Sequence, residues 1–211
     1  NGYIVLPPQV LNAGNYGVPE SRERVIFIGI RKDALREEAK QALTAENIPE
    51  EFNPYPHPTH AGDIKGDGLL QKVTTYDVLK DLPEPADAID PSQSIYSKAK
   101  FQTNGSQGQT EIKLDGLGPT IRSEHHGNIE FRRLSAEHGG KHMVELNSGM
   151  QERRLTPREC ALIQTFPPDY RFVMPYDGRK YRLSSSGAYK VIGNAVPPVL
   201  AFNIAMRLQE L

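Results

Sequence analysis

The pattern of apolar and polar positions predicts short elements separated by long loops. Residues 25–30 are apolar at almost every position, which is typical of a strand buried on both faces of a parallel or mixed sheet. Residues 3–11 predict an earlier strand that Pro7 and Pro8 make irregular. Residues 33–46 carry apolar side chains at helical spacing and predict a helix.

Two later helices have recognisable start signals. Thr156 is a favourable N-cap, Pro157 suits the first helical position and Glu159 completes a capping box. Pro198 opens a final helix whose apolar residues recur along one face. Residues 75–82 predict a shorter helix. These signals place helices in the middle and at the end of the chain.

The region between residues 83 and 155 is rich in turn residues. Short strand-like pieces occur at 119–122, 128–134 and 142–146, and residues 104–109 form a glycine-rich loop. This composition predicts a small, loop-rich, mostly β unit.

Charge is unevenly distributed along the 211 residues. The formal net charge is -1, but residues 1–32 carry +2, residues 33–92 carry -8 and residues 93–211 carry +5. A polyanion responds to the local field, so a basic C-terminal half is compatible with a nucleic-acid face. Ordinary fluctuation of charge along a chain explains the same numbers, and the charge pattern alone leaves both interpretations open.

Composition restricts the class of protein. A mean hydropathy of -0.54 and the lack of a long apolar run argue against a membrane span. The single cysteine excludes an internal disulfide and a thiolate zinc cage. The spacing of His138 and His142 across two glycines does not suit zinc either, so no metal site is expected. We expect a cytoplasmic protein.

Three segments carry a resemblance to a known family. Residues 16–24 read YGVPESRER, residues 154–167 read RLTPRECALIQTFP, and residues 192–201 read IGNAVPPVLA. In this order they resemble the eighth, ninth and tenth motifs of the DNA cytosine-5 methyltransferases. The eighth motif is usually Gln-x-Arg-x-Arg, and this chain has Glu20 in place of the glutamine.

The resemblance implies an α/β fold with two parts. One part is the edge of a Rossmann-like domain that uses S-adenosyl-L-methionine, and the other is a small, mostly β target-recognition domain. The expected boundaries are residues 1–32 for the eighth-motif strand, 33–167 for the recognition domain with the ninth-motif helix, and 168–211 for the return to the catalytic domain.

Other family motifs are absent from this sequence. It contains no Phe-x-Gly-x-Gly loop for the cofactor, no Pro-Cys nucleophile and no Glu-Asn-Val motif. Cys160 follows Glu159 and lies in the ninth-motif helix, so we expect a buried core thiol. The expected partners are therefore double-stranded DNA and an N-terminal catalytic half that carries the nucleophile. Alone, the chain should be inactive.

The family reaction needs a cation beside the target base. Thiolate attack on C6 of cytosine drives charge toward N3 and O2, and a fixed guanidinium stabilises that charge. By resemblance Arg24 is the O2 donor and Arg22 organises the pocket. Glu20 could pair with an arginine and alter the local field. The alternative is that both arginines are solvated charges beside a strand.

The resemblance also implies contacts with cofactor and DNA. Asn194 and Ala195 in the tenth-motif turn should touch the amino-acid end of S-adenosyl-L-methionine, although helix capping explains the same turn. Because the target base leaves the stack, loops must grip the duplex. The expected DNA contacts are Gln107, Gln109, Thr120, Arg122, Arg132, Arg133 and Arg153. An ordinary half-exposed strand accounts equally well for the segment around Thr120.

Two further expectations follow. Without its other half, the chain should expose apolar surface from residues 25–30 and from the last helix, and should self-associate. The family assignment places it in a bacterial restriction–modification system, at the nucleoid. A non-catalytic DNA-binding module derived from the same family is the alternative function.

Overall fold

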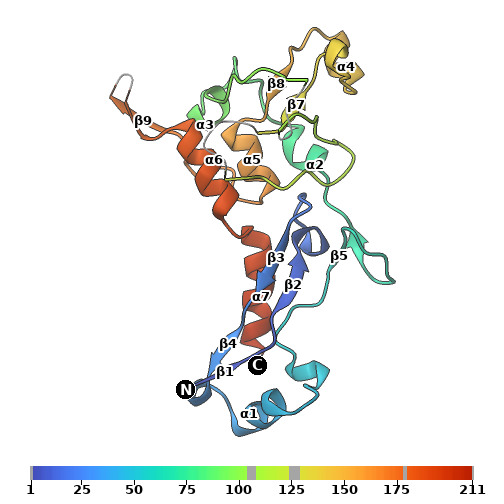
Figure 1. Ribbon diagram of the computed structural model, residues 1–211, viewed down its shortest axis with the longest axis vertical. Coiled ribbons are helices and arrows are strands. Elements are labelled where there is room, and N and C mark those ends of the chain that lie inside the picture. The colour runs from blue at the N-terminus through green and yellow to red at the C-terminus, as the bar shows by residue number, and fades with distance from the viewer. Residues whose placement is uncertain (1, 104–107, 124–128, 178–179, 211) are drawn as a thin grey trace.

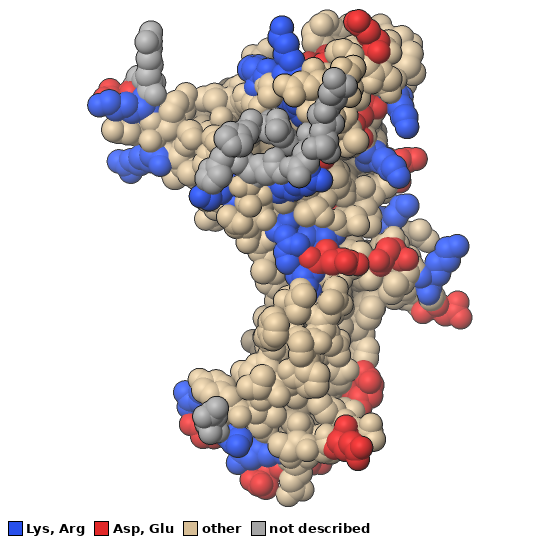
Figure 2. Space-filling view, viewed as in Figure 1, with Lys and Arg blue, Asp and Glu red and all other residues tan. Residues whose placement is uncertain are grey.

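The computed structural model describes residues 2–103, 108–123, 129–177 and 180–210. These residues form two lobes joined by a narrow waist (Figures 1 and 2). The first lobe comprises residues 2–72 and 198–210, and the second comprises residues 73–193. Each lobe has its own cluster of buried apolar side chains.

The first lobe is built on two short antiparallel ladders. Strand β1 pairs with β4 and strand β2 pairs with β3, with Tyr3 opposite Arg31 and Gln9 opposite Ile26. The elements of this lobe are β1 (Tyr3–Val5), β2 (Gln9–Asn12), η1 (Ala13–Tyr16), β3 (Glu23–Ile26), β4 (Gly29–Arg31), η2 (Lys32–Ala34), α1 (Glu37–Thr44), η3 (Glu50–Phe52), β5 (His60–Ala61), β6 (Leu70–Gln71) and α7 (Pro198–Gln209).

The apolar run at residues 25–30 differs from its prediction. It is divided between β3 and β4, and the side chains of Val25 and Phe27 are 54% and 72% exposed. Pro7 and Pro8 lie between β1, the partner of β4, and β2, the partner of β3. Neither proline has a backbone N–H to donate. Residues 25–30 are therefore not buried on both faces in this structure. The prediction that they expose apolar surface is confirmed.

Helix α7 packs onto the first lobe by one side. Leu200 is fully buried in the first-lobe core, and Ile204 packs against it. Phe202 and Met206 are 64% and 43% exposed. The predicted final helix is thus confirmed, and its outer face adds to the exposed apolar surface.

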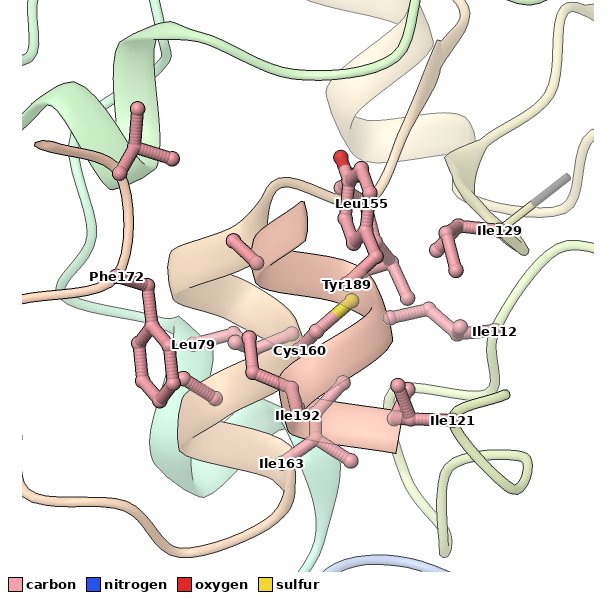
Figure 3. Close-up of a cluster of buried hydrophobic side chains, with 13 residues drawn as sticks. Leu79, Ile112, Ile121, Ile129, Leu155, Cys160, Ile163, Phe172, Tyr189 and Ile192 are labelled. Atoms are coloured by element: carbon pink, nitrogen blue, oxygen red, sulfur yellow. The ribbon is translucent and has the colours of Figure 1, made fainter. Parts of the chain in front are cut away.

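The second lobe surrounds two packed helices, α5 and α6 (Figure 3). Cys160, Ile163 and Ile192 are fully buried between them and their neighbours. The elements are α2 (Thr75–Leu79), α3 (Pro91–Ser94), β7 (Phe131–Arg133), η4 (Ala136–His138), α4 (Met143–Asn147), β8 (Arg153–Arg154), α5 (Pro157–Ile163), β9 (Met174–Asp177), β10 (Lys180–Leu183) and α6 (Ser185–Asn194).

The start of α5 confirms the predicted capping box. The backbone N–H of Glu159 donates to Thr156 Oγ1 at 3.0 Å, and the N–H of Thr156 donates to Glu159 Oε2 at 2.8 Å. These two bonds satisfy donors that the helix leaves open in its first turn. The helix is therefore fixed at its N-terminus by its own sequence.

Two predictions about the middle region are wrong. The piece at 142–146 predicted as a strand is the helix α4, and the described residues at 119–122 form no strand. Within the described part of 33–167, short helices outnumber short strands, so this region is loop-rich but not mostly β. Short apolar runs do not by themselves separate helix from strand.

The buried cores also divide the chain differently from the expected domains. Leu43 and Tyr55 belong to the first-lobe core, although both lie in the region assigned to the recognition domain. Phe172 and Tyr189 belong to the second-lobe core, although both lie beyond residue 167. In this structure the chain crosses between lobes near residues 72 and 195.

Residues Ser185–Gln209 are long and apolar enough to be considered as a membrane span, contrary to the expectation from hydropathy. The structure interrupts this stretch: α6 ends at Asn194 and α7 begins at Pro198. A span needs about 20 continuous helical residues, and each of these helices is shorter.

The second-lobe core should dominate the stability of that lobe. Replacing the fully buried Leu155 by alanine should lower the free energy of unfolding by about 2–5 kcal/mol, because it removes buried methyl groups and leaves a cavity. The matched change Leu70→Ala, at a side chain 62% exposed, should cost about 0.5 kcal/mol or less. If urea denaturation gave the same loss of unfolding free energy for both variants, the result would contradict the dominant role of this core.

Candidate functional site

Three segments that are distant in sequence meet at the waist between the lobes. They are residues 19–22, 118–122 and 193–195, and we call them the junction. The backbone N–H of Ser21 donates to the carbonyl of Gly118 at 2.9 Å, and the N–H of Gly118 donates to Pro19 at 2.9 Å. The junction thus brings the motif that resembles the eighth together with the turn that resembles the tenth.

The guanidinium of Arg22 is the centre of the junction. Its side chain is fully buried. Nη2 donates to the carbonyl oxygens of Gly193 at 2.5 Å and Ala195 at 2.9 Å. Nη1 donates to the carbonyl of Ile121 at 2.8 Å and to Glu20 Oε1 at 3.3 Å. One side chain therefore ties all three segments together, and its role beside a base pocket stays a prediction.

Gly193 is required by the close approach of the backbones. A Cβ atom at this position would lie 2.3 Å from the carbonyl carbon of Arg122 and 2.5 Å from the nitrogen of Ser123. Both are backbone atoms that no side-chain rotation could move away. Gly193 lies in the tenth-motif segment, and nothing in the sequence alone indicates this packing role.

Glu20 is the buried acidic partner of Arg22. Its Oε1 accepts from the backbone N–H of Ile121 at 2.6 Å as well as from Arg22. Oε2 has no hydrogen-bond partner among the described residues. Burial raises the pKa of Glu20 to about 7, and the charge of Arg22 opposes this rise. The pairing considered from the sequence is therefore present.

Arg24 lies outside this network. It is half-buried on β3, opposite Leu11 of β2, and its Nη1 donates to the neighbouring carbonyl of Glu23 at 2.6 Å. None of its recorded hydrogen bonds in the described part of the chain reaches the junction. Its guanidinium remains at the surface next to the buried Arg22, so the geometry is compatible with the expected contact to a base.

Asn194 is the last residue of α6, and Ala195 caps the C-terminus of this helix. The Asn194 side chain is exposed, whereas the Ala195 carbonyl is occupied by Arg22. An exposed amide offers donors and an acceptor that suit the carboxylate and ammonium of an amino acid. These two residues fit S-adenosyl-L-methionine only as one edge of a site, and the remaining ligands must come from other residues.

The loops expected to contact DNA are only partly described. Gln107 lies outside the described residues. Gln109 accepts from the backbone N–H of Gln102 at 2.9 Å, and Thr120 Oγ1 donates to the Ser21 carbonyl at 2.6 Å. Thr120 thus helps to form the junction. Arg122 is exposed beside it.

Three arginines expected to contact phosphate are buried instead. Arg132 and Arg153 are 7% exposed and Arg133 is fully buried. Each pairs with carboxylates: Arg132–Glu145 2.5 Å, Arg133–Glu84 2.6 Å, Arg133–Glu145 2.8 Å, Arg153–Glu84 3.0 Å and Arg153–Glu159 2.8 Å. The prediction that these three arginines contact phosphate is therefore wrong, because their charges are already neutralised inside the second lobe.

The cluster has a structural role that explains its burial. A buried ion needs a partner to offset its lost hydration. The arginines hold the pKa of Glu84 and Glu145 below the ordinary value, despite the opposing effect of burial. Glu159 also serves the capping box of α5. The cluster therefore joins that helix to the β7–β8 ladder.

Cys160 is fully buried in the second-lobe core, as expected. Burial raises the pKa of its thiol well above the ordinary value. A nucleophile must be a thiolate at working pH. This cysteine therefore has a packing role, and the described chain holds no thiolate for attack on a base.

The buried carboxyl of Glu20 should make stability depend on pH. Its pKa is about 7 in the folded protein and near 4.5 ordinarily. The folded state therefore binds more protons between these values, so the free energy of unfolding should fall as the pH rises through this window. The slope should approach about 1.4 kcal/mol per pH unit.

The substitution Glu20→Gln removes this titration and should flatten the dependence. Urea denaturation at a series of pH values measures it, with the exposed Glu23→Gln as the matched control. Identical slopes for Glu20→Gln and the unmodified chain would show that Glu20 does not titrate in this range.

Comparison with known proteins supports the family resemblance. The sequence profile of C-5 cytosine-specific DNA methylases matches residues 1–210. The chain is 29% identical to type II methyltransferase M.MthTI of Methanothermobacter thermautotrophicus, 31% identical to M.BsuRI of Bacillus subtilis and 31% identical to M.BspRI of Lysinibacillus sphaericus. The alignments cover 96%, 93% and 99% of this chain.

This chain spans about half the length of those relatives: 55%, 40% and 44%. A solved structure of a prophage-encoded Escherichia coli protein, named as a candidate DNA modification methyltransferase, covers the whole chain at 20% identity, and the chain covers 61% of it. Its TM-score of 0.44 is too low to support an argument about the fold. The profile match over 1–210 shows that the chain belongs to the C-5 cytosine-specific DNA methylase family.

Proposed function

We propose that this chain is the C-terminal part of a DNA (cytosine-5-)-methyltransferase of a bacterial restriction–modification system, acting on DNA in the cytoplasm. The supporting observation is the junction, where the buried Arg22 joins the eighth-motif segment to the tenth-motif turn. A non-catalytic module has no evident need for this arrangement beside the half-buried Arg24, whose guanidinium lies at the surface. The relatives' names support the reaction class.

The proposed reaction transfers a methyl group to C5 of an extruded cytosine. A cysteine thiolate from the N-terminal half adds to C6, C5 takes the methyl group, and loss of the C5 proton then expels the thiolate. S-adenosyl-L-methionine supplies an electrophilic methyl group on its sulfonium. Arg24 donates to O2 of the base, where negative charge grows during the addition.

The other junction residues act by position. Arg22 fixes the carbonyls of the tenth-motif turn and so holds Asn194 at the edge of the cofactor site. Arg122 is the exposed last residue of the junction segment 118–122, and we assign it to the DNA side together with Thr120 and Gln109. Guanidinium suits both phosphate and guanine.

The exposed apolar side chains support the proposal that another part of the enzyme covers this chain. Val25 and Phe27 on the strand region, and Phe202 and Met206 on α7, are all substantially exposed. Large apolar side chains exposed in this way are typical of an interface when they gather into a patch. We propose that the N-terminal half of the enzyme covers it, and that this chain self-associates when that half is absent.

Reconstitution tests the proposed function. This chain alone should transfer no label from methyl-labelled S-adenosyl-L-methionine to duplex DNA, because Cys160 is buried and neutral. The complete enzyme, containing the N-terminal half, should methylate DNA. Arg24→Ala in that enzyme should lower kcat by about 10²–10³-fold, whereas Arg36→Ala at an exposed site of the first lobe should leave kcat unchanged.

Two results would count against the proposal. Label transfer by this chain alone would show that it contains its own nucleophile. DNA binding without methylation by the complete, folded enzyme would favour the alternative function, a non-catalytic DNA-binding module.

A further inference from the structure

A second cationic site lies in the second lobe, away from the junction residues. An open groove of about 700 Å³ runs between the start of α3, the first turn of α5 and the β9–β10 hairpin. Its apolar wall is formed by Pro91, Val173, Met174, Pro175 and Tyr176. Three arginines also line it, at positions 158, 171 and 182.

Arg158 provides a fixed cation in this groove. It is 5% exposed, and its Nε donates to Asp90 Oδ2 at 2.6 Å. The same aspartate caps α3 by accepting from the N–H of Ser92 at 2.9 Å, which holds the pair in place. Nη1 of Arg158 has no hydrogen-bond partner among the described residues. A buried donor of this kind is costly unless a ligand or water satisfies it.

Arg171 and Arg182 are exposed members of the same lining. The guanidinium carbon of Arg182 lies 5.9 Å from the centroid of the Tyr176 ring, so the ring helps to orient it. The lining also contains Asp90 and Asp169. Since Asp90 is paired with Arg158, the exposed lining has two arginines against one aspartate. Basic side chains flank this hairpin in Figure 2.

We propose that this groove binds the sugar-phosphate backbone of the DNA substrate, outside the base pocket. The inference rests on the proposed function, since it assigns a second contact to the same substrate. The arginines match the charge and planar geometry of a phosphodiester, and the apolar wall matches the face of a deoxyribose. The net positive lining disfavours a metal cation.

Such a contact strengthens binding without reading sequence. Each phosphate that a basic group neutralises releases counterions, so the affinity becomes more sensitive to salt. The groove should therefore contribute equally to cognate and arbitrary duplexes.

The test uses the complete enzyme and a fluorescein-labelled duplex of arbitrary sequence. The double variant Arg171→Gln/Arg182→Gln should raise Kd by about tenfold near 0.1 M salt and reduce the slope of log K against log salt by about 1 to 2. The matched control Arg31→Gln/Arg36→Gln removes two exposed charges from the first lobe and should leave the slope unchanged. Arg171→Lys/Arg182→Lys should restore the slope.

The outcomes separate this inference from the proposed function. An unchanged Kd and slope for the glutamine variant, in an enzyme that still binds and methylates DNA, would overturn the groove alone. A fall in the slope that the control variant reproduces would also overturn it, since the effect would then be one of net charge. An unmodified enzyme that neither binds nor methylates DNA would overturn both.

Discussion

The buried guanidinium of Arg22 holds the two lobes in their relative positions. It donates to carbonyl oxygens of the second-lobe loop and of the C-terminal end of α6 with its cap residue, and it pairs with Glu20 in its own segment. A buried charge is tolerated only when such partners offset its lost hydration. The position of the Asn194 edge relative to the Arg24 surface depends on this contact, whereas Arg24 itself is placed by the β2–β3 ladder.

The same contact explains two unusual features of the junction. Gly193 is needed because the turn approaches the backbone of Arg122 within the space of a methyl group. Glu20 stands at the glutamine position of the eighth-motif pattern that this segment resembles, and its pKa is raised because burial disfavours its charge. When the Glu20 carboxyl is protonated, it carries an O–H donor, as the side-chain amide of glutamine carries N–H donors. The substitution is therefore compatible with the geometry of the motif.

Much of the fold could be predicted from sequence where the signal is local. The capping box of Thr156 and Glu159 defines the start of α5, and Pro198 defines the start of α7.

The buried arginines could not be predicted from such local signals. Arg153 pairs with Glu84, and the two residues are separated by 69 positions in the sequence. Only the folded chain brings them together. The run at 25–30 predicted a strand buried on both faces because an apolar pattern alone does not say which faces the folded chain covers. Of the candidate site, the burial of Cys160 and the pairing of Glu20 with an arginine could be predicted from sequence, whereas the hairpin groove had no local signal.

The central claim is that Arg22 ties the tenth-motif turn to the eighth-motif segment, and amide hydrogen exchange tests it most directly. In Arg22→Gln, peptides covering residues 192–197 should lose protection relative to the unmodified protein. Peptides covering α5 should keep theirs, since that helix is capped by its own residues. Unchanged protection at the turn would contradict the account.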